Sequence, residues 1–209
     1  MRQSRSALIL PSIGWGRITA MAVDSQMVEL GTPAPDFTLP SVTTGEQVSL
    51  KDFDDAPALL VVFLSNHCPY VRHLESQLGT VTANLARVGL ATVAISSNDV
   101  INYPEDAPER LVDQIGRAGF VFPYLYDASQ EAARAYRAAC TPDFFLYDRG
   151  RLLAYRGQFD NSRPKNGVPV TGASLTEAVE RVIAGETVPE PHYASIGCSI
   201  KWRPGNEPS

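Results

Sequence analysis

The sequence has little of what marks several common classes of protein. Its three cysteines are too few for a disulfide-stapled scaffold and too scattered for a zinc site. No apolar run approaches the roughly 20 residues that a membrane-spanning helix needs. The net charge of −5 argues against nucleic acid or an anionic membrane as a partner. Since the sequence also has no internal repeat or low-complexity tract, its 209 residues indicate an ordinary globular protein.

The N-terminal segment is not typical of a folded domain. Two arginines precede a short apolar stretch at residues 7–13, as in a signal peptide, but proline and glycine interrupt the stretch. We expect residues 1–27 to be a disordered or non-native extension, with a signal peptide, or a true start at Met21 or Met27, as alternatives. One domain is predicted over residues 28–209, and we expect the protein to be cytoplasmic.

A cysteine stands at a predicted junction between a strand and a helix. The apolar run at residues 59–64 suits a buried parallel strand, and apolar residues recur at helical spacing over residues 71–88. Cys68 lies between the two, and Pro69 suits the first position of a helix. The unpaired N–H groups and the helix dipole there favour a thiolate over a thiol. The sequence therefore predicts a redox-active thiol at Cys68.

The order of the predicted elements indicates one α/β fold. A β-hairpin comes first, and a strand, a helix and a second strand then form a βαβ unit whose strands are parallel. A helix–strand–helix stretch follows, and a β-hairpin and a helix come after it. The predicted elements are the hairpin at 36–53, the strand at 90–95, helices ending near Gly119 and Ala139, the hairpin around Arg149 and Gly150, and the helix at 174–185. This βαβ…ββα order predicts a thioredoxin-like fold, with a central mixed sheet flanked by helices, an N-terminal β-hairpin and an extended C-terminal tail.

The predicted topology brings polar residues to the edge of the sheet where Cys68 lies. The parallel strand ends at the same edge, just before Asn98 and Asp99, and ligands in open α/β sheets gather at the carboxyl ends of such strands. Asp99 directly follows this strand. The residues expected to line the site are His67, Pro69, Tyr70 and Asp99. No second His, Cys or carboxylate stands at the spacing of metal ligands, so neither a metal nor another cofactor is expected.

Several short sequence motifs are similar to motifs found in one superfamily. They are GTPAPDFTLP, FLSNHCPYV, SSND, FPYLYD, CTPDFFLYD and SIGCSIKW, all within residues 31–202. On these motifs the chain resembles the thioredoxin-like superfamily, and within it a peroxiredoxin-like branch of the alkyl hydroperoxide reductase and thiol-specific antioxidant family. Cys68 aligns with the first cysteine of a thioredoxin CxxC motif. Val71 stands where that motif has its second cysteine, and where peroxiredoxins have their peroxide-reactive cysteine.

The resemblance also assigns roles to residues far from Cys68 in the sequence. Pro142, preceded by Thr141, matches the cis-proline that faces the active cysteine across the fold. Cys140 lies two residues earlier, so it either resolves an oxidised Cys68 or is only a small packed residue. Cys198 lies in an alternating apolar stretch, where it is either a core thiol or, if the tail crosses the active-site edge, a resolving thiol.

Two kinds of function follow from these assignments. The first is a thiol-dependent oxidoreductase with an antioxidant role, in which a peroxide or a disulfide reacts with Cys68. A low-molecular-weight thiol or a thioredoxin-type reductant would then regenerate it. The alternative is a non-catalytic module for redox sensing or protein binding. It is motivated by Val71 and by Val62, which stands where thioredoxins carry a buried acid.

Overall fold

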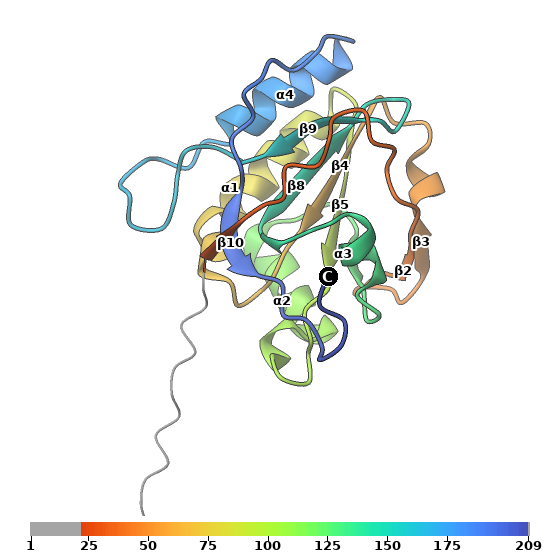
Figure 1. Ribbon diagram of the computed structural model, residues 1–209, viewed down its shortest axis with the longest axis vertical. Helices are drawn as coiled ribbons and strands as arrows, with labels where there is room; N and C mark the ends of the chain where they lie inside the picture. Colours follow the sequence, from red (N-terminus) through yellow and green to blue (C-terminus); the bar gives the residue numbers. More distant parts are fainter. Residues whose placement is uncertain (1–21, 209) are drawn as a thin grey trace, which may run out of the picture.

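The computed structural model describes residues 22–208, and a five-stranded mixed sheet forms its centre (Figure 1). The strand order is β6-β5-β4-β8-β9. Strands β5 and β6 run parallel to the central β4, and β8 and β9 complete the sheet in antiparallel fashion. The bounds are β4 Ala58–Phe63, β5 Leu90–Ser96, β6 Tyr124–Tyr126, β8 Asp143–Tyr147 and β9 Leu153–Gly157. The thioredoxin-like fold predicted from the sequence is therefore confirmed.

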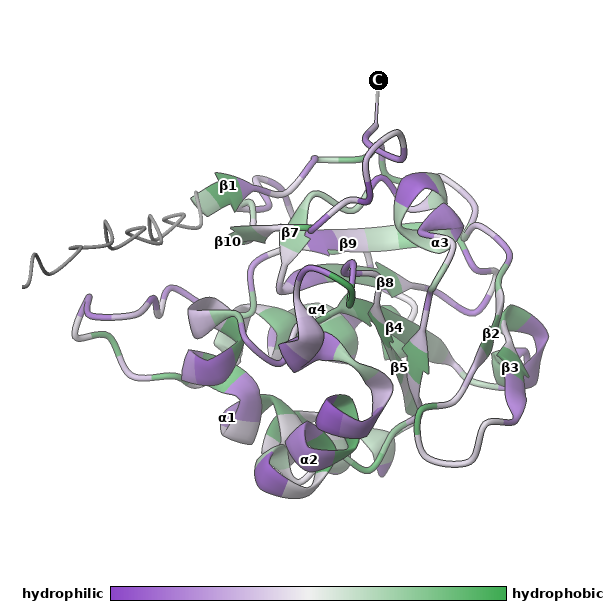
Figure 2. Ribbon diagram, turned by 90° about the horizontal axis from the view of Figure 1, so that it is seen from below, coloured by the Kyte–Doolittle hydropathy of each residue, from purple (hydrophilic) through white to green (hydrophobic). Residues whose placement is uncertain are grey.

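Both faces of the sheet are covered, which explains why β4 is apolar at every position. All six residues of β4 are buried. One core lies between the sheet and helices α1 Pro69–Ala86, α2 Pro108–Ala118 and α4 Ala173–Ile183. The other lies beneath α3 Glu131–Ala135 and the N-terminal segments. Figure 2 shows hydrophobic residues along the central strands β4 and β5, and helices in which hydrophilic and hydrophobic residues are mixed.

Helix α1 follows the pattern expected of its sequence. Pro69 occupies its first turn, and the apolar residues spaced three and four apart turn towards the sheet. The chain leaves the helix after Ala86 and reaches Gly89, whose φ of 114° is unfavourable for other residues. The helix thus ends where the sequence predicts, and its first residue directly follows Cys68.

The N-terminal hairpin is also present. Strands β2 Thr38–Pro40 and β3 Gln47–Ser49 pair antiparallel, and a short 3-10 helix, η1 Leu50–Phe53, follows them. A bridge between Ser41 and Leu125 joins this region to the end of β6. Leu39 and Val48 of the hairpin pack against the core that does not contain Cys68, so the contribution of the hairpin to the site is indirect.

The C-terminal tail forms a strand, β10 Ile196–Ser199, at the centre of a second small sheet. It pairs antiparallel with β7 Cys140–Thr141 on one side and with β1 Ala22–Asp24 on the other. The expected extended tail is therefore confirmed. Strand β1 falls within residues 1–27, which the sequence analysis left outside the fold, and residues 1–21 lie outside the described part of the chain.

Two helices begin or end at other residues than predicted, in each case because contacts with distant parts of the chain fix the helix end. Helix α3 ends at Ala135 rather than near Ala139, since Tyr136 packs in the core and Arg137 takes a positive φ. Helix α4 begins one residue before Ser174, and the two residues that lead into it are bonded by a side chain from an earlier loop. Asp160 Oδ2 accepts the backbone N–H groups of Thr171 and Gly172 at 2.6 and 2.7 Å. None of the helices within residues 22–208 is long and apolar enough to cross a membrane.

Candidate active site

Cys68 occupies the N-cap position of α1 and is 0% exposed. Its backbone is extended, so the chain turns from the end of β4 into the helix at this residue. Its backbone N–H donates to Ser65 Oγ at 3.3 Å. The junction predicted from the sequence is thus present, and the sulfur lies beside the N–H groups of the first helical turn.

The cis-proline expected at Pro142 faces this cysteine. The Thr141–Pro142 peptide bond is cis, and the Cys68 thiol donates to the Thr141 carbonyl oxygen at 3.0 Å. Thr141 belongs to β7, where it stands opposite Cys198 of β10. A Cβ atom on Gly197 would overlap the Thr141 carbonyl group, so only glycine allows the two strands to lie this close.

Several hydrogen-bond donors converge on the Cys68 sulfur. The Cys198 side chain has the largest effect on the pKa of Cys68 and lowers it, whereas burial raises it. The Thr141 side chain and the backbone N–H groups of Val71 and Cys198 lower it further, and the net result is a pKa of about 6. Because hydrogen bonds to the charged form stabilise it, Cys68 is largely a thiolate at neutral pH.

The hydroxyl of Thr141 has a distinct place among these donors. It is buried, and Oγ1 has no aligned hydrogen-bond partner within residues 22–208 while the Cys68 proton is directed at the Thr141 carbonyl. Loss of that proton leaves a sulfur to which the hydroxyl can donate, which agrees with the lowered pKa of Cys68. Thr141 therefore offers a carbonyl to the thiol and a hydroxyl to the thiolate.

The other two cysteines differ in their relation to Cys68. Cys198 packs in the same core cluster as Cys68, and the hydrogen bond to Cys68, together with burial, raises the pKa of the Cys198 thiol. Cys140 stands opposite Ser199 in the β7–β10 ladder, and its thiol donates to the Pro142 carbonyl at 3.5 Å. Burial and the neighbouring Asp143 raise the pKa of Cys140. Cys198 therefore shares the core of Cys68 and influences its pKa, while Cys140 bonds to the backbone.

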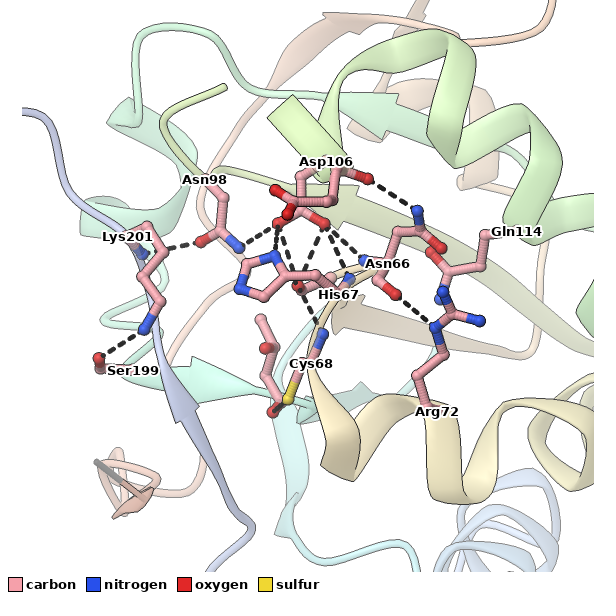
Figure 3. Close-up of polar contacts among 12 residues, drawn as sticks. Asn66, His67, Cys68, Arg72, Asn98, Asp106, Gln114, Ser199 and Lys201 are labelled. Atoms are coloured by element: carbon pink, nitrogen blue, oxygen red, sulfur yellow. Dashed lines mark hydrogen bonds and ion pairs between the residues drawn. The ribbon is translucent and has the colours of Figure 1, made fainter. Parts of the chain in front are cut away.

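A buried carboxylate, which the sequence analysis did not single out, organises the segment before Cys68. Asp106 ends the short 3-10 helix η2 Pro104–Asp106 in the stretch inserted after β5, and it is 0% exposed. Its oxygens accept the N–H groups of Asn66 and His67 at 2.7 and 3.2 Å, and the Ser65 hydroxyl at 3.0 Å. These bonds fix the chain that leads to the thiol (Figure 3).

His67 shares the same carboxylate. Its ring Nδ1 donates to Asp106 Oδ2 at 2.9 Å, and the ring stacks on Tyr103 with centroids 5.5 Å apart. Burial lowers the pKa of His67, but the hydrogen bond and charge of Asp106, helped by Cys68, outweigh it and raise the pKa overall. Burial likewise raises the pKa of Asp106, and the bond and charge of His67 reverse this, so its pKa is lowered. Both shifts favour an imidazolium–carboxylate pair.

Asn98 joins Asp106 to the C-terminal segment. Its Nδ2 donates to Asp106 Oδ2, and its Oδ1 accepts the backbone N–H of Lys201 at 2.8 Å. The Lys201 ammonium donates to Ser199 Oγ at 3.4 Å and lies over the Tyr103 ring at 5.6 Å from the centroid. Figure 3 shows this chain of contacts from Ser199 and Lys201 through Asn98 to Asp106 and His67. The segment after β10 is thus tied to the loop that carries the thiol.

The other residues expected to line the site lie around it. Tyr70 packs against the core that contains Cys68, and it lines a small cavity with Pro142. Asp99 bonds instead within its own loop, where its carboxylate accepts the Ile101 N–H at 3.1 Å and the Asn102 amide at 2.6 Å. Its neighbour Asn98 is the residue at this strand end that reaches the Asp106 network.

Sequence reasoning missed Asp106 because its partners are remote in the chain. Its bond to His67 spans 39 positions, and it lies in a loop that follows no strand directly. The sequence gives only an indirect indication of a buried acceptor. Polar Ser65, Asn66 and His67 stand together where a buried strand ends, and their buried N–H groups need an acceptor. Within residues 22–208, no group of three or more His, Cys, Asp or Glu side chains could hold a metal ion.

Comparisons with solved structures agree with this architecture. The chain is 50% identical to a hypothetical protein from Sinorhizobium meliloti, with a TM-score of 0.85, over 87% of this chain and 99% of that one. It is 47% identical to an uncharacterized conserved protein from Geobacillus kaustophilus, with a TM-score of 0.86, over 88% of this chain and 98% of that one.

A more distant similarity concerns the fold alone. A thiol:disulfide interchange protein of the thioredoxin family from Chlorobium tepidum is 19% identical, with a TM-score of 0.57, over 75% of this chain and 99% of that one. No match was found among curated proteins. The family model described as AhpC/TSA matches residues 30–156, which contain Cys68, Asp106 and Pro142. The chain therefore belongs to the AhpC/TSA family and has a thioredoxin-like fold.

Proposed function

We propose that the protein is a thiol oxidoreductase in which Cys68 is the nucleophile, and that it reduces hydroperoxides or small disulfides in an antioxidant role. The observation that carries the proposal is the group of donors around the Cys68 sulfur, which lowers its pKa to about 6. A thiolate is the reactive form of cysteine, and these donors maintain it at neutral pH. Membership of the AhpC/TSA family supports the same kind of chemistry.

The proposed reaction with a hydroperoxide begins with attack of the Cys68 thiolate on the terminal oxygen. The O–O bond breaks, Cys68 becomes a sulfenic acid, and an alkoxide or hydroxide leaves. His67, whose protonated form Asp106 stabilises, is the proposed proton donor to this leaving group. With a small disulfide, the thiolate forms a mixed disulfide and one thiolate leaves instead.

Burial of Cys68 bears on the size of the substrate. Its exposed fraction is 0%, so the surrounding protein has to move before an electrophile reaches the sulfur. A hydroperoxide or a low-molecular-weight disulfide needs less displacement of the protein than the disulfide of another folded protein. We therefore propose a small-molecule substrate, with a low-molecular-weight thiol as the first choice of reductant and a thioredoxin-type protein as the second.

The proposal extends to the location of the protein, its partners and its cofactors. Cys68, Cys140 and Cys198 are all free thiols, as expected in a compartment where reductants keep thiols reduced, so we propose a cytoplasmic location. With a net charge of −5, the protein is not expected to bind nucleic acid or an anionic membrane. We propose no metal or other cofactor, because the reaction above uses only side chains of this chain.

The test is turnover with Cys68→Ser as the matched control. Hydrogen peroxide, cumene hydroperoxide, glutathione disulfide and insulin are offered separately, with glutathione or dithiothreitol as the reductant. We expect consumption of at least one of the small electrophiles, little or none of insulin, and no activity in Cys68→Ser. A wild type that consumes none of them faster than Cys68→Ser would refute the enzymatic proposal.

One observation favours a second candidate function. A fully buried thiol with Val71 in place of a second CxxC cysteine suits a sensor that is oxidised once rather than an enzyme that turns over. A sensor would consume one equivalent of oxidant and stop, even with excess reductant. The turnover experiment therefore separates the two functions by the number of equivalents consumed.

A further inference from the structure

A second thiol lies in the same part of the core as the proposed nucleophile. Cys198 stands opposite Thr141 in the β7–β10 ladder, and the carbonyl of the same Thr141 accepts the Cys68 thiol proton at 3.0 Å. Cys68 and Cys198 belong to one buried core cluster, and the Cys198 side chain is the largest influence on the pKa of Cys68. Two residues separated by 130 positions are therefore brought together around the Thr141 backbone.

The backbone is built so that this approach is possible. Gly197 precedes Cys198, and a Cβ there would overlap the Thr141 carbonyl and come within 3.1 Å of the Pro142 nitrogen. Any side chain at this position would push β10 away from the cis-proline. The absence of a side chain at Gly197 therefore permits the approach that brings Cys198 to Cys68.

Cys140 is the competing thiol, and the register of the small sheet disfavours it. Side chains alternate between the two faces of a strand, and directly opposed residues share a face. Cys140 is opposed to Ser199, and Thr141 is opposed to Cys198, so Cys140 and Cys198 lie on opposite faces. The Cys140 thiol bonds to the Pro142 carbonyl at 3.5 Å. Cys198 is thus the cysteine on the same side as Cys68.

We infer that Cys198 resolves oxidised Cys68, so that the protein's catalytic cycle passes through a Cys68–Cys198 disulfide between the start of α1 and β10. The inference rests on the proposed function, since it requires Cys68 to be oxidised first. It also explains how the protein can form a disulfide without a CxxC motif, because the second cysteine comes from the C-terminal strand rather than from the first turn of α1. The two sulfur atoms have to approach to the S–S bond length of about 2.05 Å.

The chemistry of the resolving step is balanced. The Cys198 sulfur attacks the sulfur of the Cys68 sulfenic acid, the S–O bond breaks, and the hydroxide leaves with the Cys198 proton as water. After reaction with a small disulfide, Cys198 attacks the mixed disulfide, and the small thiolate leaves with that proton. Two equivalents of a thiol reductant then restore both cysteines and become oxidised to one disulfide.

The choice of substitution at Cys198 separates resolution from activation. Cys198→Ser keeps an O–H group that can donate to the Cys68 thiolate, but it cannot form a disulfide. Cys198→Ala loses both properties. Cys140→Ser is the matched control, because it removes the other buried thiol and leaves the Cys68–Cys198 pair intact.

The reduced proteins are treated with one equivalent of hydrogen peroxide or glutathione disulfide, and the remaining thiols are alkylated. Peptide mapping by mass spectrometry then identifies the linked cysteines. We expect a peptide linked through Cys68 and Cys198 in the wild type and in Cys140→Ser. In Cys198→Ser we expect a Cys68 sulfenic acid that dimedone traps, or a stable mixed disulfide with glutathione. Circular dichroism shows whether each variant is folded.

The outcomes distinguish a failed inference from a failed function. A Cys68 that is oxidised but linked to Cys140, or that forms no internal disulfide in the wild type, overturns the inference and leaves the proposed nucleophile intact. Equal lifetimes of the sulfenic acid in the wild type and in Cys198→Ser also overturn it. A Cys68 that resists both electrophiles and iodoacetamide in every folded variant removes the proposed function itself.

Discussion

The Nδ1 atom of His67 lies 2.9 Å from Oδ2 of Asp106, although the two residues are 39 positions apart. The carboxylate also accepts hydrogen bonds from the backbone N–H groups of Asn66 and His67. One buried group therefore fixes both the imidazole ring and the peptide segment that leads into α1. This relationship links the loop inserted after β5 to the proposed chemistry of Cys68.

Asp106→Asn tests this link. The amide keeps the shape of the carboxylate but loses its charge and one acceptor oxygen, so the pKa of His67 is expected to fall. Stability is expected to drop by about 1–3 kcal/mol, because buried donors lose their acceptor. Loss of a positioned proton donor is expected to slow turnover by roughly 10²-fold or more at pH 7. Urea unfolding and pH profiles of turnover measure these effects.

Asp113→Asn is the matched control for Asp106→Asn. Asp113 lies on α2, its side chain is 62% exposed, and its partner Arg110 is equally exposed. Such surface pairs contribute little, so we expect stability to change by less than about 1 kcal/mol and turnover to stay the same. Equal behaviour of the two variants would remove Asp106 from the proposed site.

The reactivity of Cys68 with iodoacetamide is expected to follow its thiolate fraction. In Cys140→Ser, which retains Cys198, the rate is expected to rise with pH and reach half its maximum near pH 6. In a Cys140→Ser/Cys198→Ala protein the midpoint is expected to move towards the roughly 8.5 of an ordinary cysteine, since the strongest donor is gone. Mass spectrometry of the Cys68 peptide gives the rate at each pH. Identical midpoints in the two proteins would mean that Cys198 does not activate Cys68.

Gly197→Ala tests the close approach of β10 to the cis-proline. The new methyl group meets the Thr141 carbonyl, so β10 has to shift, and stability is expected to fall by about 1–3 kcal/mol. The midpoint of Cys68 alkylation is expected to rise in the same variant, because Cys198 moves away from the sulfur. A stable variant with an unchanged midpoint would contradict the tight packing at this position.

Gly116→Ala is its control. Gly116 lies in α2, and a Cβ there meets no atom within 4 Å. Because alanine is the better helix former, we expect this variant to gain roughly 0.5–1 kcal/mol and to leave Cys68 unchanged. The two substitutions add the same methyl group with opposite expected effects on stability.

The raised pKa of Asp143 is expected to make the stability of the protein depend on pH. Burial raises the pKa of Asp143 to about 8, against about 3.9 for an exposed aspartate. The folded state therefore holds a proton that the unfolded state releases, and the contribution of Asp143 to stability, full below pH 4, is lost as the pH rises towards 8. In Asp143→Asn this part of the pH dependence is expected to disappear. Unfolding by urea at pH 5 and pH 8 measures it, with exposed Asp55→Asn as the control, expected to behave as the wild type.

The sequence was sufficient for the fold and for the position of the thiol, because both depend on local patterns. The apolar run before Cys68, the helical spacing after it and Gly119 at the end of the next helix all lie in the predicted elements. These features need only a few consecutive residues to define them. The cis bond at Pro142 was expected instead from the resemblance to thioredoxin-like proteins.

The groups that surround the thiol could not be predicted in the same way, because they come from distant segments. Asp106 lies in an inserted loop, and nothing in its neighbourhood reveals that it accepts donors from residues 65–67. Cys198 was placed in an extended tail, but its partner depends on the register of β10 against β7. Helix α3 ended early for a related reason, since Tyr136 packs in the core with residues from distant segments, such as Phe37 and Phe63.

The place of β10 in the chain sets the order in which the site is assembled during synthesis. The ribosome releases β4, α1 and β8 well before it releases β10, and domains begin to form from the N-terminal side as the chain emerges. Until β10 pairs with β7, Cys68 lacks the donors that Cys198 provides. The nascent chain therefore carries an ordinary thiol, and the reactive one arises only when the last strand is in place.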